Sequence, residues 1–246
     1  MSAAHRPDGV PTAGAPSWHV VLTGPRAGDQ RREALDFLAV SRGHRPGTWE
    51  TVHRCPGCGS DQHGAPSLRL TAAARRRRGR DRPDGGASTP AVSFSRCGGW
   101  LATAWLDPEP ADGGAAAGDG APWRIGVDIE LVDSPAFATE DGLGPAGSSV
   151  GFAPEELQAV ARLPEAQRPA VRATLWAVKE AVVKARGTGF TADPAELVVG
   201  RHDPQAGALV LGVPGHPEAV IAVGTQWPGG EPPEGQVGAV VLLSGR

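Results

Sequence analysis

The chain of 246 residues has no tyrosine, one methionine and three cysteines, and only 5% of its residues are aromatic. Three cysteines cannot form a disulfide framework, and the N-terminus lacks a charged-then-apolar leader, so a reducing cytoplasm is the expected compartment. No apolar run approaches the roughly 18 residues of a membrane helix, which predicts a soluble protein without a membrane partner. The formal net charge is −3, so the overall charge does not indicate nucleic acid.

Glycine and proline are abundant instead. The 35 Gly and 24 Pro residues exceed ordinary usage and predict substantial loops and linkers. The length suffices for one large domain or two small ones with a hydrophobic core. We expect a disordered N-terminus at 1–16, an N-terminal lobe at 17–106, a linker at 107–122 and a C-terminal lobe at 123–246.

Each half mixes strand and helix patterns, which predicts an α+β fold with two lobes. The strand patterns lie at 17–23, 91–95, 100–106, 123–131, 196–200, 208–213, 219–225 and 237–243. The helical patterns lie at 29–41, from 152 onward and at 169–186. The stretch 42–67 is turn-rich, and 75–84 is expected to be an arginine-rich loop.

The segment 124–130 carries two carboxylates on one face of a predicted strand. Because strand side chains alternate, Gly126, Asp128 and Glu130 share a face opposite the apolar residues. Paired carboxylates suit magnesium, which keeps several waters and binds substrate phosphates, and Gly126 would let a ligand approach closely. The alternative from spacing alone is an edge strand whose polar face is wet.

A predicted helix at 169–186 carries a second group of polar residues. Trp176, Glu180 and Lys184 recur at helical spacing on a face other than the apolar stripe. Taken alone, Glu180 and Lys184 form an ordinary surface ion pair. The alternative is that Glu180 supplies a third carboxylate to the same metal and that Lys184 reaches a phosphate.

Together, GVDIE at 126–130 and WAVKEAVVKA at 176–185 resemble the signature of 4'-phosphopantetheinyl transferases of the surfactin-synthetase-activating (Sfp) type. FAPEE at 152–156 and GTGF at 187–190 are also similar to this family. The resemblance covers about 91–190 well, 55–70 in part and the N-terminus poorly. It implies two pseudo-symmetric α/β lobes in one chain, for which a monomer is sufficient.

A weaker similarity continues upstream, where 91–100 resembles the family segment in which a Ser-His pair contacts coenzyme A. Ser95 is kept, and Arg96 stands where the family has the histidine that meets the 3'-phosphate. Arginine holds a phosphate bidentately, so the exchange is compatible with binding. At 58–66 the family's basic residue is replaced by Ala65, and the family's basic N-terminal helix has no clear match.

The resemblance implies transfer of 4'-phosphopantetheine from coenzyme A to a serine of an apo acyl or peptidyl carrier domain, with release of 3',5'-ADP. Carrier domains of non-ribosomal peptide, polyketide or fatty-acid synthases are the implied partners. The implied magnesium ligands are Asp128, Glu130 and Glu180.

The same resemblance assigns roles to residues of the helix. Glu180 is implied as general base, and Lys184 is implied to neutralise charge on the leaving nucleotide. Trp176 and Lys179 are implied to shape the coenzyme pocket, and Lys179 fits a solvated helix position equally well.

Three further features have two interpretations each. The arginine run at 75–82 would steer acidic carriers or reach phosphates, or it is a solvated loop. The residues around Cys55 and Cys58, with His53 and His63, are of the zinc-binding type, but no second Cys pair accompanies them. Cys97 is expected to be a small packed residue rather than a nucleophile. The alternative functions are a degenerate family member that binds coenzyme A or a carrier domain without transfer, and another magnesium-dependent enzyme that acts on a pyrophosphate.

Overall fold

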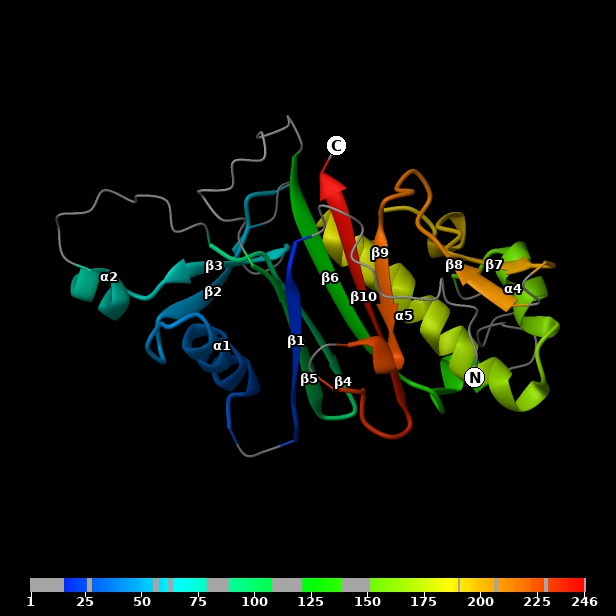
Figure 1. Cartoon of the computed structure of the whole chain (residues 1–246), viewed down its shortest axis with the longest axis horizontal. Coiled ribbons are helices and arrows are strands. Elements are labelled where there is room, and N and C mark those ends of the chain that lie inside the picture. The colour runs from blue at the N-terminus through cyan, green and yellow to red at the C-terminus, as the bar shows by residue number, and fades with distance from the viewer. Residues whose placement is uncertain are drawn as a thin grey trace.

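The structure of the chain is a computed structural model (Figure 1), which describes residues 16–25, 28–54, 58–61, 64–78, 89–107, 121–138, 151–189, 191–205, 208–227 and 230–245. The N-terminal lobe comprises β1 (Trp18–Thr23), α1 (Gln30–Ser41), β2 (Trp49–His53), β3 (Pro66–Leu70), α2 (Ala72–Arg78), β4 (Val92–Cys97) and β5 (Trp100–Leu106). No helix among these residues is long and apolar enough to cross a membrane.

The C-terminal lobe begins with the longest strand that the structure describes. Its elements are β6 (Ala121–Leu131), α3 (Pro135–Ala138), α4 (Pro154–Ala161), α5 (Arg168–Arg186), β7 (Gly200–Asp203), β8 (Ala208–Leu211), β9 (Val220–Val223) and β10 (Gln236–Gly245). Short 3₁₀ turns lie at Glu165–Gln167, Pro194–Glu196 and Gly224–Gln226. The last of these follows β9 directly.

The two lobes repeat one topology. In each, a strand and a helix are followed by a two-stranded hairpin and then by the last two strands of a three-stranded sheet. The strand orders are β1-β5-β4 and β6-β10-β9, so the last strand of each lobe lies in the middle of its sheet. The expected α+β fold with two pseudo-symmetric lobes is therefore confirmed.

The two sheets pack face to face between the two long helices, which gives the layers α1, N-terminal sheet, C-terminal sheet and α5 (Figure 1). Apolar side chains of β1, β5, β6 and β10 fill the space between the sheets. A second cluster joins α1 to the outer face of the first sheet, and a third joins α5 to the outer face of the second. Because both faces of each sheet are covered, β5 is buried along almost its whole length.

Some local predictions differ from the structure. The arginine-rich segment begins as helix α2 rather than as a loop, and residues 79–84 lie outside the described residues. Strand β2 interrupts the stretch predicted as turns, and residues 196–200 begin with the end of a 3₁₀ turn and reach strand only at Gly200. Most of the predicted linker at 107–122 and all of residues 1–15 lie outside the described residues.

Gly126 makes room for a helix and not for the ligand that the sequence suggested. A Cβ atom at this position would lie 1.8 Å from the carbonyl oxygen of Ala181 and 2.8 Å from the backbone nitrogen of Ala185, both on α5. The backbone of α5 therefore packs directly against the backbone of β6 at Gly126. This contact brings the polar residues of the two elements together.

We expect Gly126→Ala to lower the free energy of unfolding by about 3 kcal/mol, because the helix backbone cannot yield as a side-chain tip would. Denaturant unfolding followed by circular dichroism measures this change. Gly212→Ala is the matched control, because no atom lies within 4 Å of its added Cβ, and its effect should stay within about 0.5 kcal/mol. Equal stability of the two variants would contradict the close packing.

Candidate functional site

The polar face of β6 lies against α5, as strand alternation predicts. Ile125, Val127 and Ile129 point into the core between the sheets. The opposite face carries Asp128, whose carboxylate bonds to a lysine of α5. The wet edge strand considered as an alternative is thus wrong for Asp128, whose side chain is 4% exposed.

The two carboxylate oxygens of Asp128 have unlike surroundings. Oδ1 accepts hydrogen bonds from Lys184 Nζ at 2.6 Å and from Ser95 Oγ at 2.7 Å. Oδ2 is buried and receives no hydrogen bond from a nitrogen or hydroxyl donor among the described residues, and the carboxyl group of Glu130 lies within hydrogen-bonding reach of Asp128. A buried carboxylate oxygen without a partner is costly, because its desolvation is not compensated. The geometry therefore leaves one oxygen available to a cation.

Three carboxyl groups act on one another at this place. Burial, followed by the charges of Asp128 and Glu180, raises the pKa of Glu130 to about 7. Burial, together with the charge of Asp128, raises the pKa of Glu180. The pKa of Asp128 is also raised by burial, against the opposing effect of Lys184. The cluster thus holds more negative charge than its single lysine neutralises.

These donors fit a hard divalent cation. The ligands are carboxylate oxygens, one of them without a partner, and their mutual repulsion would be relieved by positive charge. Among the described residues, no three His, Cys, Asp or Glu side chains are arranged as a preformed metal site. The three-ligand set of Asp128, Glu130 and Glu180 therefore stays a prediction. Magnesium often takes only one or two carboxylates and completes its shell with water and phosphate.

Two serines of β4 attach the N-terminal lobe to β6. Ser93 Oγ accepts the backbone N–H of Val127 at 3.1 Å, and Ser95 Oγ accepts that of Ile129 at 3.3 Å. These hydroxyls take the place of a paired strand along this edge of β6. Only Ser95 also donates to Asp128, so the structure brings it to the carboxylate cluster rather than to an open pocket.

The side chain of Arg96, on β4, reaches the beginning of α1. Its Nη1 donates to Gln30 Oε1 at 2.7 Å, and the amide nitrogen of Gln30 donates to the carbonyls of Thr23, Gly24 and Gly99. The exposed guanidinium of Arg96 is thereby held at the point where β1, α1 and the β4–β5 turn meet.

Arg31 is a candidate site residue that the sequence pattern did not single out. Its guanidinium lies 4.8 Å from the centroid of the Phe94 ring, and its buried Nε has no partner among the described residues. Burial and then the charge of Arg96 lower its pKa, so the two cations are neighbours. The signal was present: Asp29 caps α1, and Arg31 and Arg32 follow at the end where a helix disfavours cations.

Lys179 and Trp176 lie within the C-terminal lobe. Lys179 is fully buried, and its Nζ lies 2.7 Å from Glu156 Oε2 and 2.8 Å from the carbonyl of Pro194. The solvated position considered for it is wrong, and we assign it a structural role. The half-buried ring of Trp176 packs edge-on against the ring of Phe152, with 6.3 Å between the ring centroids, beside Gly151.

The cysteine predictions are tested only in part. Burial, followed by the charge of Glu130, raises the pKa of Cys97, which disfavours the thiolate that a nucleophile requires. Cys55 and His63 lie outside the described residues, so the zinc alternative stays open. Ala65, where the family has a basic residue, contacts the position of a Cβ at Gly187, just after α5.

Comparison with known proteins gives one informative match. Residues 124–226 match the sequence model of the 4'-phosphopantetheinyl transferase superfamily, which is less than half of the chain. The matched segment contains the carboxylate cluster and Lys184, but not Ser95 or Arg96. No curated protein sequence matches the chain.

Two solved structures from Chronobacterium ammoniagenes show a low similarity. They are described as an ACPS–CoA complex and an apo-ACPS structure. Each is 21% identical, with coverage of 51% of this chain and 98% of the other chain, at a TM-score of 0.35. This similarity is too low to bear on the function of the chain.

The buried pair of Lys179 and Glu156 leads to a stability prediction. Lys179→Met leaves Glu156 charged and buried without its cation, so we expect a loss of about 3–5 kcal/mol in the free energy of unfolding. Lys179→Met/Glu156→Gln should lose less than the single variant, because no unpaired charge remains. Denaturant unfolding of the full double-mutant cycle measures both, with Glu155→Gln as the exposed control on α4. A double variant that is less stable than Lys179→Met would contradict the pairing.

Proposed function

We propose that the protein transfers the 4'-phosphopantetheine arm of coenzyme A to a serine of an apo carrier domain and releases 3',5'-ADP. The observation that carries this proposal is the cluster of Asp128, Glu130, Glu180 and Lys184 between β6 and α5. The cluster lies within the segment that matches the phosphopantetheinyl transferase superfamily. The carriers proposed are those of non-ribosomal peptide, polyketide or fatty-acid synthases, with the enzyme acting as a monomer.

The chain's own residues suit the proton transfers of this reaction. The carrier hydroxyl attacks the β-phosphorus of coenzyme A, the bond from that phosphorus to the bridging oxygen breaks, and 3',5'-ADP leaves. Because its pKa is raised, Glu180 is a stronger base than an ordinary carboxylate, which suits it to take the hydroxyl proton. Lys184, whose side chain is 29% exposed, holds Asp128 from one side and can face the departing phosphate.

A magnesium ion held by Asp128 and Glu130, with Glu180 nearby, would neutralise the charge of the pyrophosphate. The unpartnered Oδ2 of Asp128 supports this assignment. Ser95 and Lys184 both hold the other oxygen, so the orientation of the carboxylate is set before any ion arrives.

Arg96 and Arg31 form the proposed binding site for a phosphate of coenzyme A. The two guanidiniums repel each other, and Arg31 Nε has no partner among the described residues. A phosphate would relieve this repulsion and accept bidentate hydrogen bonds. Under this proposal, Arg31 of α1 takes the role of the basic N-terminal helix that had no clear match in the sequence.

A degenerate protein that binds coenzyme A without transfer is the second candidate. The observation in its favour is Ala65, which leaves no basic side chain at the position next to Gly187. This candidate predicts that coenzyme A binds to the protein and that no phosphopantetheinylated carrier forms.

The transfer itself is tested by intact-protein mass spectrometry of an apo peptidyl carrier domain after incubation with coenzyme A and magnesium. We expect a phosphopantetheine mass gain that a magnesium-free sample does not show. Glu180→Gln should lower the rate at least about 100-fold through loss of the base. Glu155→Gln is the matched control, since it removes an exposed carboxylate outside the cluster. Coenzyme A binding without mass gain on several carriers would favour the degenerate protein.

Ser95 provides a sharper test of the cation site. Ser95→Ala removes a hydrogen bond to Asp128, so we expect magnesium binding to weaken about 10–100-fold, as for other residues that orient a metal ligand. Ser93→Ala is the matched control, because it loses the equivalent bond to the β6 backbone without touching Asp128. Isothermal titration with magnesium and coenzyme A measures both variants. An equal effect of the two substitutions would assign Ser95 to lobe attachment alone.

A further inference from the structure

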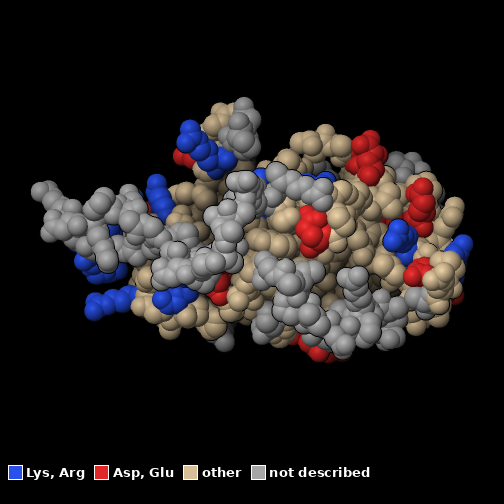
Figure 2. Space-filling view, turned by 45° about the horizontal axis from the view of Figure 1, so that its top comes forward, with Lys and Arg blue, Asp and Glu red and all other residues tan. Residues whose placement is uncertain are grey.

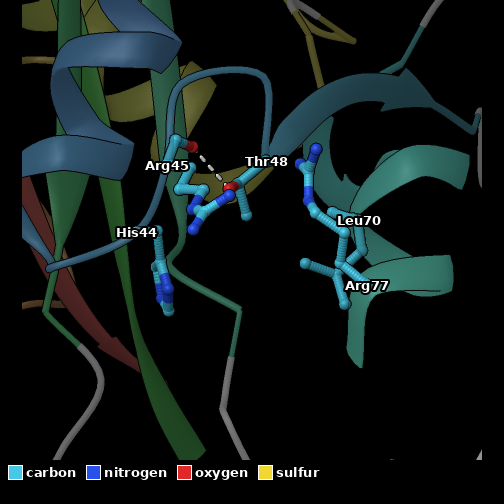
Figure 3. Close-up of a pocket in the computed structure, with 6 residues that line it drawn as sticks. His44, Arg45, Thr48, Leu70 and Arg77 are labelled. Atoms are coloured by element: carbon cyan, nitrogen blue, oxygen red, sulfur yellow. Dashed lines mark hydrogen bonds between the residues drawn. The ribbon is translucent and has the colours of Figure 1, made fainter. Parts of the chain in front are cut away.

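A basic hollow lies in the N-terminal lobe. It has a volume of about 450 Å³ and is lined by His44, Arg45, Thr48, Leu70, Ala74 and Arg77 (Figure 3). None of these residues belongs to the carboxylate cluster or to the pair of Arg31 and Arg96. The volume falls in the range of sites that hold small molecules.

Hydrogen bonds fix the walls of this hollow. Thr71 joins them: its Oγ1 donates to the carbonyl of Gly47 at 2.8 Å and accepts the N–H of Ala74 at 3.2 Å. Its backbone N–H donates to the carbonyl of Thr48 at 3.0 Å. On the other side, Asp36 of α1 accepts the N–H of Gly47. The α1–β2 connection and α2 are therefore held in a set relation before any ligand binds.

The polar lining of the hollow is basic. Arg45 and Thr48 lie on one wall, and the guanidinium of Arg77 points toward them from α2 on the other (Figure 3). Among the residues that the structure describes, neither arginine forms an ion pair and no carboxylate lines the hollow. Lys and Arg side chains are prominent at this end of the molecule, the left end of Figure 2, where α2 also carries Arg75 and Arg76.

The nearby acidic groups are occupied elsewhere. Glu50 of β2 pairs with Arg69 of β3 at 2.8 Å, and Asp36 bonds to the backbone of Gly47. Two guanidiniums facing one space without a counter-charge favour an anion that accepts from both.

The rest of the lining is apolar or aromatic. Leu70 and the buried Ala74 form an apolar surface. The ring of His44 packs edge-on against the ring of Trp49, with 5.7 Å between the ring centroids. A bare phosphate would leave this surface uncovered. A ligand with a phosphate and a flat or apolar part would use both kinds of lining.

We propose that this hollow binds a small phosphate-bearing molecule, with the phosphate between Arg45 and Arg77 and an apolar part against Leu70. The site is separate from the proposed coenzyme A site and does not depend on the proposed transfer. The buried hydroxyl of Thr48, which donates to the carbonyl of Arg45, lies beside the phosphate position.

The test uses AMP as the probe with a flat apolar part and inorganic pyrophosphate as the probe without one. Isothermal titration of the full chain without magnesium measures both. We expect AMP to bind more tightly than pyrophosphate, and Arg45→Gln/Arg77→Gln to weaken AMP binding at least about 10-fold. Both arginines are exposed, so this variant should keep the melting temperature of the parent protein.

Two matched double variants separate this hollow from other causes. Arg75→Gln/Arg76→Gln removes the same charge from α2 outside the hollow, and Arg31→Gln/Arg96→Gln removes the proposed coenzyme A phosphate site. Both should bind AMP within about 2-fold of the parent, since one side chain's exposed charge acts weakly at a distance. The carrier-modification rate of Arg45→Gln/Arg77→Gln should equal that of the parent protein.

Several results would overturn the proposal. An equal loss in Arg75→Gln/Arg76→Gln would indicate diffuse attraction, and loss of all AMP binding in Arg31→Gln/Arg96→Gln would assign it to the coenzyme A site. Binding of an acidic decapeptide of glutamate without binding of AMP or pyrophosphate would make the hollow a protein-docking surface. No binding of any probe would equally reject the site.

Discussion

The close approach of α5 to β6 is the contact on which the candidate site depends. With glycine at 126, the carbonyl of Ala181 occupies the place of a side chain, so the helix lies directly on the strand. At this separation the 2.6 Å bond from Lys184 to Asp128 forms without a bridging group. A larger residue at 126 would lift the helix and separate the lysine from its carboxylate. Gly126 thus determines both the packing of α5 on β6 and the contact between Lys184 and Asp128.

The N-terminal lobe contributes to the same cluster through a side chain. Ser95 comes from β4, yet it holds a carboxylate of β6, while Ser93 two residues earlier holds only the backbone. Because side chains alternate along a strand, both serines lie on the same face of β4 and reach the same edge of β6. The repeated topology of the lobes therefore has a chemical consequence: one lobe orients the carboxylate that the other lobe carries.

Periodicity was sufficient for the elements with a strong apolar pattern. It predicted α5, the alternation along β6 and the β4–β5 hairpin, because each has an apolar face that must be buried. Helix α2 was missed because its sequence of alanines and arginines has no apolar stripe. Strand β2 was missed because its five residues lie among turn-forming residues.

Contacts between distant segments could not be read from the sequence. Nothing in the pattern says that Lys179 will meet Glu156, or that α5 rather than a ligand will fill the space beside Gly126. Arg31 was predictable in principle, because arginine near the beginning of a helix opposes the helix dipole. The neighbouring Arg96 adds a second positive charge there, and this arrangement is consistent with the phosphate site proposed for the two arginines.

Glu156 and Asp128 are buried carboxylates of the C-terminal lobe that differ in how completely their oxygens are hydrogen-bonded. Glu156 and Asp128 each contact one lysine, and both are nearly inaccessible. Both oxygens of Glu156 are satisfied: Oε1 accepts from Val199 and Gly200, and Oε2 accepts from Ala153 and Lys179. Of the Asp128 oxygens, only Oδ1 receives a hydrogen bond from a nitrogen or hydroxyl donor of the described residues. Since the fold completes the hydrogen bonds of one carboxylate, the incomplete set at the other supports the cation site proposed at Asp128.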